Sequence, residues 1–424
     1  MHPPGDVRSL LSCATTLSLA ALLAACGDDA QGGGGVGGAG GAGGAPPVVV
    51  TLEVPAGAAQ GDELVVTVRA SSVAGSWADA EEPGAVLTVH AGANLARDVI
   101  LVGGFASETR ASLGAWDGGP VTYTLAGSAS LDEVRLDVDP SAAGLPVIAL
   151  MSNEFANDTP LLVYQSGDEL VYVMTNEDGG TGLLPTLLLA QWGRPHDIEG
   201  LYDRVTHEYQ APEHASAVFD GVFEGSHPRL RMATSNGLVA PEPADGAALY
   251  HVSPVPVGFT TSDGVPREAV LDLYPWLVAA GWLEVAREGK VAEEGGVDDP
   301  MLGALGAYVF VDYRLSDGVK ASFEVDVGGV TYSSLGIYAG DTGLTDSRSA
   351  GTGRTAIELA PHTTLADVTA VRVVPEEGAG SLESARVLAY DPVAYTPVVR
   401  GAISTPVPID AAASAVELEL IQAP

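Results

Sequence analysis

Short apolar runs separated by turn residues constrain this chain more than any other feature of its sequence. From Val48 onward, runs rich in Val, Ile, Thr and Tyr alternate with clusters of Gly, Pro, Ser and Asp. Such runs suit strands, and the clusters suit the turns between them. Only 17% of residues are charged, so few solvated helix faces can be built. We therefore predict a mainly β protein, with tandem β-sandwich domains and a central β-rich α+β domain that carries one or two helices.

The charge balance excludes two classes of partner. The chain has 19 Lys and Arg against 55 Asp and Glu, a formal net charge of −36. A protein that binds nucleic acid needs a basic surface to displace counterions from phosphates, and a polybasic membrane-surface protein needs one to meet anionic lipids. We therefore predict that the chain binds no nucleic acid and does not meet a membrane through a basic surface.

The N-terminus carries a sorting signal. Arg8 is followed by the uncharged stretch 9–25, which suits the apolar core of a secretory signal but is marginal for a membrane span. It ends in Leu23-Ala24-Ala25-Cys26, which resembles the lipobox of bacterial lipoproteins. The resemblance implies that residues 1–25 are a removed signal peptide and that Cys26 is lipidated. Cys13 lies in the removed segment, so we predict a folded body without disulfides, thiolate metal ligands or a cysteine nucleophile.

A glycine-rich segment follows the lipobox. We predict that residues 26–47 form a disordered tether with a reach of about 25 Å, because this composition cannot bury apolar surface. Two or more acyl chains anchor a protein stably, so the bilayer is the predicted partner at Cys26. Gly27 stands where an Asp can retain a lipoprotein in the inner membrane. The resemblance therefore implies a lipid anchor in the outer membrane of a Gram-negative bacterium, with the body facing the periplasm or the cell surface.

The remaining chain divides into three predicted domains. We predict an immunoglobulin-like β-sandwich over 48–140, a central His-rich β domain over 144–296 and a C-terminal β-sandwich over 301–424. A helix is predicted over 275–288, because Pro275 suits a first turn and Gly289 a terminus. Its predicted buried stripe consists of Trp276, Ala279, Ala280, Leu283 and Ala286. The tail after Pro397 offers no motif.

Acidic residues recur on the predicted strands of the two outer domains. They could bind calcium, but we predict that they form solvated strand faces. The residues are Asp137 and Asp139 in the first domain, and Asp312, Glu324 and Asp326 in the third.

The central domain contains the strongest candidate site. Five of the eight histidines lie between His196 and His251. The run Gly193-Arg194-Pro195-His196-Asp197-Ile198-Glu199 is similar to the Gly-His-Arg-His-Asp-Trp-Glu heptad of the necrosis-inducing secreted proteins, and more loosely to the Asp-Trp-Glu motif of Vps62-like proteins. In the first family the initial His, the Asp and the Glu of the heptad face a divalent cation on a β-sandwich.

The resemblance carries over residue by residue. Asp197 and Glu199 match the two carboxylates, and His196 matches the second His. Arg194 stands where the family has its first His, and Ile198 where it has Trp. A guanidinium cannot coordinate a cation, so the cation site implied by the resemblance lacks one of its ligands.

The residue types allow three interpretations of this cluster. Asp197 and Glu199 are two apart, so on a strand their carboxylates share one face, and such oxygen ligands suit Ca²⁺ or Mg²⁺. His196 would then orient a ligand or act as an acid or base. The alternatives are a structural ion-pair cluster, in which Arg194 pairs with a carboxylate, and a catalytic acid/base pair.

Other candidates in this region are Asp178, His207 and His214. His207-Glu208 begins like a zinc-protease helix, but Ala211 stands where the second His is required. No Gly-x-Ser-x-Gly motif of a serine hydrolase occurs.

Two functions follow as hypotheses. The first is a non-enzymatic surface lipoprotein that serves as a binding, adhesion or structural module, with a protein or glycan as ligand. The second is a divalent-cation-dependent module, a hydrolase or a membrane-active protein, centred on His196, Asp197 and Glu199. The missing ligand at Arg194 favours the first, so a non-enzymatic role is expected.

Overall fold

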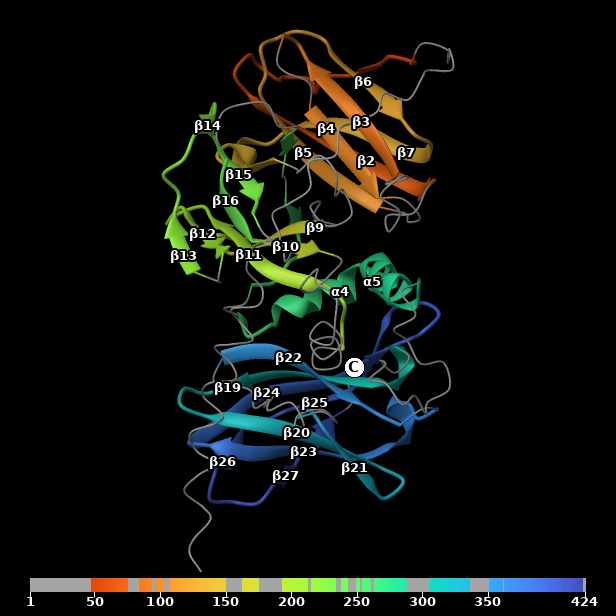
Figure 1. The fold of residues 1–424 in the computed structure, drawn as a ribbon, viewed down its shortest axis with the longest axis vertical. Coiled ribbons are helices and arrows are strands. Elements are labelled where there is room, and N and C mark those ends of the chain that lie inside the picture. The colour runs from red at the N-terminus through yellow and green to blue at the C-terminus, as the bar shows by residue number, and fades with distance from the viewer. Residues whose placement is uncertain are drawn as a thin grey trace, which may run out of the picture. The chain divides into compact units, whose positions relative to one another are not determined.

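A computed structural model describes most of the chain after the predicted tether. It describes residues 47–74, 84–93, 97–102, 107–149, 162–174, 193–212, 215–233, 238–242, 249–251, 254–260, 263–287, 305–335, 351–360 and 362–421. The chain divides into two units, 1–46 with 339–345 and 47–338 with 346–424, and every described residue belongs to the second. This unit confirms the predicted fold class: it is mainly β, with several antiparallel sheets and two helices (Figure 1).

Two sheets share the first apolar core. One runs in the order β5-β2-β7, and the other begins β1-β6-β3-β4. Their alternate residues, such as Leu64, Val66 and Val68 of β2 and Leu87 and Val89 of β3, pack between them. The strands are β1 (Val50–Leu52), β2 (Glu63–Val73), β3 (Gly84–Ala91), β4 (Arg97–Val102), β5 (Ser107–Ala115), β6 (Val121–Ala126) and β7 (Ala129–Val138).

The second of these sheets continues into the central region. Beyond β4 its order is β17-β8-β15-β14, with β16 paired to β15. Residue pairing therefore crosses the boundary predicted near residue 140, because β17 lies between β4 and β8. The boundaries of the three domains stay predictions. The strands are β8 (Val147–Ala149), β14 (Phe223–Glu224), β15 (His227–Met232), β16 (Val239–Pro241) and β17 (Leu249–His251), and a 3₁₀ turn, Pro140–Ala142, precedes β8.

A six-stranded sheet forms the middle of the central region. Its order is β13-β12-β11-β10-β9-β18. Leu170, Tyr172 and Met174 of β10 pack into a core shared with β8, β15 and β16, whereas Val171 and Val173 pack into a core shared with the helices. The strands are β9 (Leu162–Ser166), β10 (Glu169–Met174), β11 (Asp197–Asp203), β12 (Glu208–Ala211), β13 (Ala215–Val218) and β18 (Val255–Pro256).

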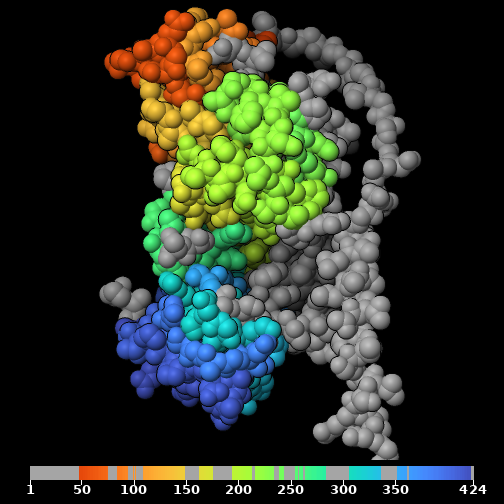
Figure 2. Space-filling model, turned by 90° about the vertical axis from the view of Figure 1, so that its left-hand side faces the viewer, coloured from red at the N-terminus to blue at the C-terminus, as the bar shows by residue number. Residues whose placement is uncertain are grey.

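The C-terminal strands form two further sheets around one core. One has the order β22-β19-β24-β25-β28, with β26 paired to β24, and the other β21-β20-β23-β27. The strands are β19 (Tyr308–Leu315), β20 (Lys320–Val327), β21 (Val330–Ser333), β22 (Gly351–Glu358), β23 (Val368–Glu377), β24 (Ala379–Tyr390), β25 (Pro397–Ile403), β26 (Val407–Asp410), β27 (Val416–Glu417) and β28 (Leu420–Ile421). Figure 2 shows these strands in cyan and blue in space-filling form. Two 3₁₀ turns, Leu305–Ala307 and Leu365–Asp367, precede β19 and β23.

Both faces of β19 are buried, and they belong to different cores. Val309 and Val311 point into the core between the two C-terminal sheets, whereas Tyr308 and Phe310 pack against the helices. Successive side chains of a strand point to opposite faces, so a run of apolar residues is expected in a strand covered on both sides. The outer face of this sheet therefore carries the helices.

The two α-helices are α4 (Val270–Leu273), which a 3₁₀ turn, Arg267–Ala269, precedes, and α5 (Pro275–Arg287). Helix α5 matches the predicted helix, but the predicted single buried stripe is too narrow for its first two turns. Leu277, Val278 and Trp282 are buried as well as Ala280, because this helix shares one core with β9, β10, β19, β22 and β24. The side chains of Leu283 and Ala286 lie outside the described part. Among the described residues, no helix has both the length and the apolar character that crossing a membrane requires.

Candidate functional site

The residues around the predicted heptad lie at the start of β11. His196 immediately precedes the strand, and its ring is fully buried. Its Nε2 atom donates a hydrogen bond to the carbonyl oxygen of Leu277 in α5 over 2.6 Å. Its Nδ1 atom has no hydrogen-bond partner among the described residues. The pKa of His196 is lowered to about 4, mainly by burial and also by the positive charge of Arg194, while the hydrogen bond to Leu277 opposes this shift. The ring is therefore neutral at pH 7.

The two carboxylates lie on β11, two positions apart. In the pairing with β10, Glu199 stands opposite Tyr172 and Asp197 opposite Met174. Burial raises the pKa of Tyr172 well above its usual value, and the negative charges of Asp197 and Glu199 add to this shift. The Glu199 carboxylate also lies 3.6 Å from the guanidinium of Arg267. The face that the two carboxylates share is thus occupied by a buried phenol and an arginine.

Arg194 lies in the turn that precedes β11. Its guanidinium donates a hydrogen bond to the carbonyl oxygen of His196 and lies 3.5 Å from the carboxylate of Glu268. It holds the turn before β11 against the turn that leads into α4. Within the described part of the chain, no group of three or more His, Cys, Asp or Glu side chains lies close enough to hold a metal ion.

His207, another predicted candidate, lies in the turn between β11 and β12. Its Nδ1 atom lies 2.6 Å from the hydroxyl of Tyr202, and its backbone has a positive φ of 60°. Asp203 accepts hydrogen bonds from the backbone amides of Val205 and Thr206 in the same turn. His207 thus helps to hold a turn. Asp178 and His214 lie outside the described residues.

The acidic residues of the predicted strand faces are paired with arginines. Asp137 lies 3.2 Å from Arg135, and Asp139 lies 3.0 Å from Arg110. In the C-terminal sheets, Arg372 bonds both Asp326 and Glu324. Each of these carboxylates thus has a cationic partner, on the same strand for Asp137 and on another strand for the others.

A buried polar cluster joins β2, β5 and β15. The Glu63 carboxylate accepts hydrogen bonds from Ser112 Oγ at 2.6 Å and from His227 Nε2 at 3.1 Å. His227 Nδ1 also lies 2.8 Å from the carbonyl oxygen of Leu145. In a serine-protease triad the imidazole contacts the serine hydroxyl, whereas here one Glu63 oxygen, Oε1, contacts both groups. The cluster is therefore a buried ion pair that links the first core to the central region.

A second buried network attaches α4 to the C-terminal sheet. The Arg354 guanidinium donates to Asp312 at 2.5 Å, to Asp272 at 3.1 Å and to the hydroxyl of Tyr390 at 2.6 Å. Arg386 donates to both aspartates. Burial alone would raise the pKa of Asp272, but Arg354 above all outweighs it and lowers that pKa. The arginines and aspartates neutralise one another, and this pairing offsets the free-energy cost of burying their charges.

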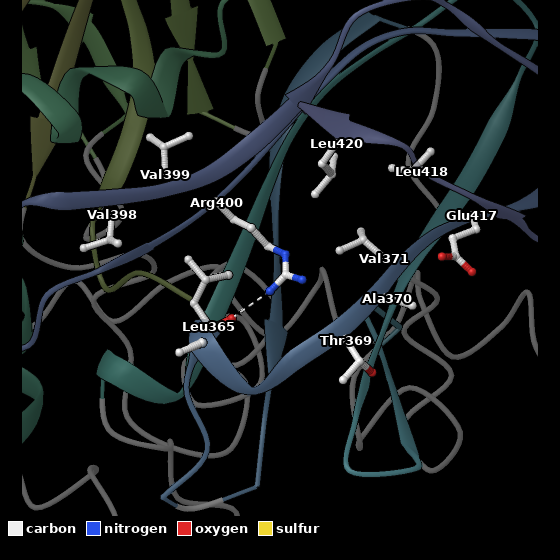
Figure 3. Close-up of a pocket in the computed structure, with 11 residues that line it drawn as sticks. Leu365, Thr369, Ala370, Val371, Val398, Val399, Arg400, Glu417, Leu418 and Leu420 are labelled. Carbon is white, nitrogen blue, oxygen red and sulfur yellow. Dashed lines mark hydrogen bonds between the residues drawn. The ribbon is translucent and has the colours of Figure 1, made fainter. Parts of the chain in front are cut away.

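A cavity of about 570 Å³ opens at one edge of the C-terminal sandwich. Figure 3 shows Arg400 extending into it between apolar side chains, with one hydrogen bond of 3.1 Å to the carbonyl oxygen of Leu365. Cavities of this size are typical of ligand sites. Arg400 is not among the site residues predicted from the sequence, because the tail after Pro397 offers no motif. The available signal was a lone cation inside the apolar run Val398-Val399-Arg400-Gly401-Ala402-Ile403.

Comparison with protein-family models, with curated proteins and with solved structures found no match for this chain.

Proposed function

We propose that this protein is a lipoprotein of a bacterial outer membrane, anchored through an acylated Cys26, whose β body is a binding or adhesion module. The sequence Leu23-Ala24-Ala25-Cys26 carries this proposal, because small residues before a Cys at the end of a short apolar stretch form a lipidation signal. The glycine-rich segment 27–47 supports it, since it would hold the body clear of the lipid headgroups. A protein or a glycan is the ligand class expected of such a module.

A binding role has more support than a cation-dependent activity. His196 is buried beneath α5 and is neutral, and Glu199 lies beside Arg267. A general acid or base must reach the proton that it transfers, and His196 is screened from solvent by packing. The cavity beside Arg400, in contrast, is open to a ligand.

The anchor is tested by expressing the full chain in a Gram-negative host and separating the membranes. Mass spectrometry should find acyl chains on Cys26, and Cys26→Ser should release the protein into the soluble fraction. Cys13→Ser is the matched control, because Cys13 lies in the removed segment and its loss should leave the protein anchored. A Cys26→Ser protein that stayed in the membrane fraction would contradict the proposal.

The cation-dependent alternative has its own test. Calorimetric titration of the full chain with CaCl₂ or MgCl₂ should give no saturable heat if β11 serves only packing. Saturable binding in the wild type that is lost in Asp197→Asn, with Asp137→Asn as the control, would favour the alternative.

A further inference from the structure

The cavity lies where the end of the chain crosses from one C-terminal sheet to the other. Strand β27 adds to the outer edge of β23, with Arg372 opposite Glu417. Strand β28 adds to the outer edge of β25, with Ala402 opposite Ile421. Each is only two residues long, so within the described residues the chain covers only part of each edge.

Among the described residues, the neighbouring parts of the same edges have no partner strand. On the side away from β20, residues 368–370 of β23 pair with no strand among the described residues. On the side away from β24, residues 397–401 of β25 likewise have no partner strand in the described part of the chain. Unpaired strand edges present backbone donors and acceptors that can bind another strand. The fold already uses both edges in this way at β27 and β28.

The walls of the cavity suit an apolar ligand. Figure 3 shows Val398 and Val399 on one side of Arg400, and Val371, Leu418 and Leu420 on the other. Val371 and Leu418 belong to the core of the sandwich, and Val398 is half exposed. A side chain that entered from outside would therefore reach the core between the two sheets.

Arg400 is the cation of the cavity, which the carboxylate of Glu417 also lines. Its one hydrogen bond goes to a carbonyl oxygen, and within the described residues it forms no ion pair. Most of the other described arginines do form ion pairs: Arg69, Arg110, Arg135, Arg194, Arg229, Arg231, Arg267, Arg314, Arg354, Arg372 and Arg386. A guanidinium in an apolar groove favours a carboxylate, which it can bind with two parallel hydrogen bonds.

We propose that this cavity binds an extended peptide, which adds as a strand to the open edge of β25 and places an acidic side chain against Arg400. The inference rests on the binding role proposed above but not on the lipid anchor. A peptide fits better than a fatty acid for two reasons. The open edges supply backbone hydrogen bonds that only a peptide can use, and Glu417 gives the cavity a second polar wall, which suits a ligand with donors along its length.

The test uses labelled synthetic peptides and the full chain. One peptide of about ten residues alternates Val and Thr around a central Glu, and the other carries Gln at that position. Fluorescence anisotropy should show that the Glu peptide binds about tenfold more tightly, because charge-assisted hydrogen bonds are roughly twice as strong as neutral ones. This comparison needs no variant of the protein.

Variants of the protein then test whether Arg400 causes the difference in affinity between the Glu and Gln peptides. Arg400→Gln should bind the two peptides equally, and Arg400→Glu should prefer a peptide with a central Lys. Arg204→Gln is the matched control, because Arg204 bonds only carbonyl oxygens in a different turn and should leave both affinities unchanged. Circular dichroism with thermal unfolding checks that each variant folds, and Cys26→Ser should bind the Glu peptide as the wild type does.

Three results would overturn the proposal. The first is that neither peptide binds the wild type. The second is equal affinity of the wild type for the Glu and Gln peptides. The third is saturable binding of laurate that excludes both peptides, which would identify an acyl-chain site. None of these results bears on acylation of Cys26, so the two proposals fail separately.

Discussion

The Nε2 atom of His196 lies 2.6 Å from the carbonyl oxygen of Leu277, and this hydrogen bond joins the start of β11 to helix α5. Gly281 lies one turn further along the helix and makes room for the ring. A Cβ atom at Gly281 would lie 2.5 Å from Cε1 of His196 and 2.4 Å from Cγ of Pro195. His196, one of the candidate residues, thus packs between a sheet and a helix.

We expect the free energy of unfolding to fall at acid pH because His196 is buried. Its pKa falls from 6.5 in the unfolded chain to about 4 in the folded protein, so the unfolded state binds the proton more readily. The stability is fully present above pH 6.5 and is lost as the pH falls toward 4. We expect His196 to account for a loss of about 2 kcal/mol in the free energy of unfolding between pH 7.5 and pH 5.

Urea unfolding at the two pH values measures this loss. His196→Asn should reduce the difference between pH 7.5 and pH 5 relative to the wild type. His362→Asn is the control, because His362 is exposed and has a positive φ of 64°, a conformation that Asn tolerates. An unchanged difference in His196→Asn would contradict the assignment.

Gly281→Ala should destabilise the protein although alanine is the better helix former. The gain in helix propensity is about 1 kcal/mol, but the added methyl group has no space against Pro195 and His196. Overpacking of this kind costs about 1–3 kcal/mol, so we expect a lower thermal midpoint. Gly306→Ala should have a smaller effect, because the nearest atom to its Cβ, in Pro392, is 3.4 Å away. A raised midpoint in Gly281→Ala would show that α5 can shift.

We expect the pair of His227 and Glu63 to depend on pH in the opposite sense to His196: its contribution to stability decreases as the pH rises. Burial tends to lower the pKa of His227, but the hydrogen bonds that its ring donates to Glu63 and to the carbonyl oxygen of Leu145, together with the charge of Glu63, outweigh burial and raise the pKa above 6.5. This stabilisation is fully present below pH 6.5 and is lost as the pH rises through the raised pKa. Glu63→Gln should lower the pKa of His227 in an NMR titration.

The same variant should cost about 3 kcal/mol of stability at pH 6, since it leaves a buried charge without its partner. Glu108→Gln breaks only an exposed pair with Arg69 and should change stability far less. Equal effects of the two variants would mean that His227 is not charged in the folded protein.

Arg354→Met should be among the most damaging single substitutions in the C-terminal sheets. It leaves Asp272 and Asp312 buried without their main partner, and breaking a buried pair in this way costs about 3–5 kcal/mol. Tyr390→Phe removes one hydroxyl from the same network and should cost only about 1 kcal/mol. Urea unfolding of the two variants measures both values, and similar losses would show that Arg354 is not the centre of the network.

Local pattern explains which strands could be predicted. β2, β19 and β20 carry alternating or continuous β-branched residues, the pattern that predicts a strand. β5, with the sequence SETRASLGA, and β22, with GTGRTAIE, lack such runs. They are strands because each pairs along its length with a strongly apolar neighbour, β2 or β19.

For the candidate site, too, the sequence predicts relations along one strand but not contacts with other elements. The spacing of Asp197 and Glu199 correctly places them on alternate positions of one strand. It could not show that Tyr172 faces them or that Arg267 lies beside Glu199, because both partners come from other elements. The only local signal of Arg400 was a lone cation in an apolar run, which could not reveal a cavity built from β23, β25 and residues 417–420.

The sequence by itself determined the fold class, because alternation and turn residues act between neighbours along the chain. It also contains Leu23-Ala24-Ala25-Cys26, on which the proposed anchor rests. Only the tertiary structure decided which charged groups are neutralised. Arg354 and Asp272 are 82 positions apart, and whether a carboxylate binds a cation or an arginine depends on what packing brings within a few ångströms of it. Packing paired Glu199 with Arg267 and left Arg400 in an open cavity without an acidic partner among the described residues.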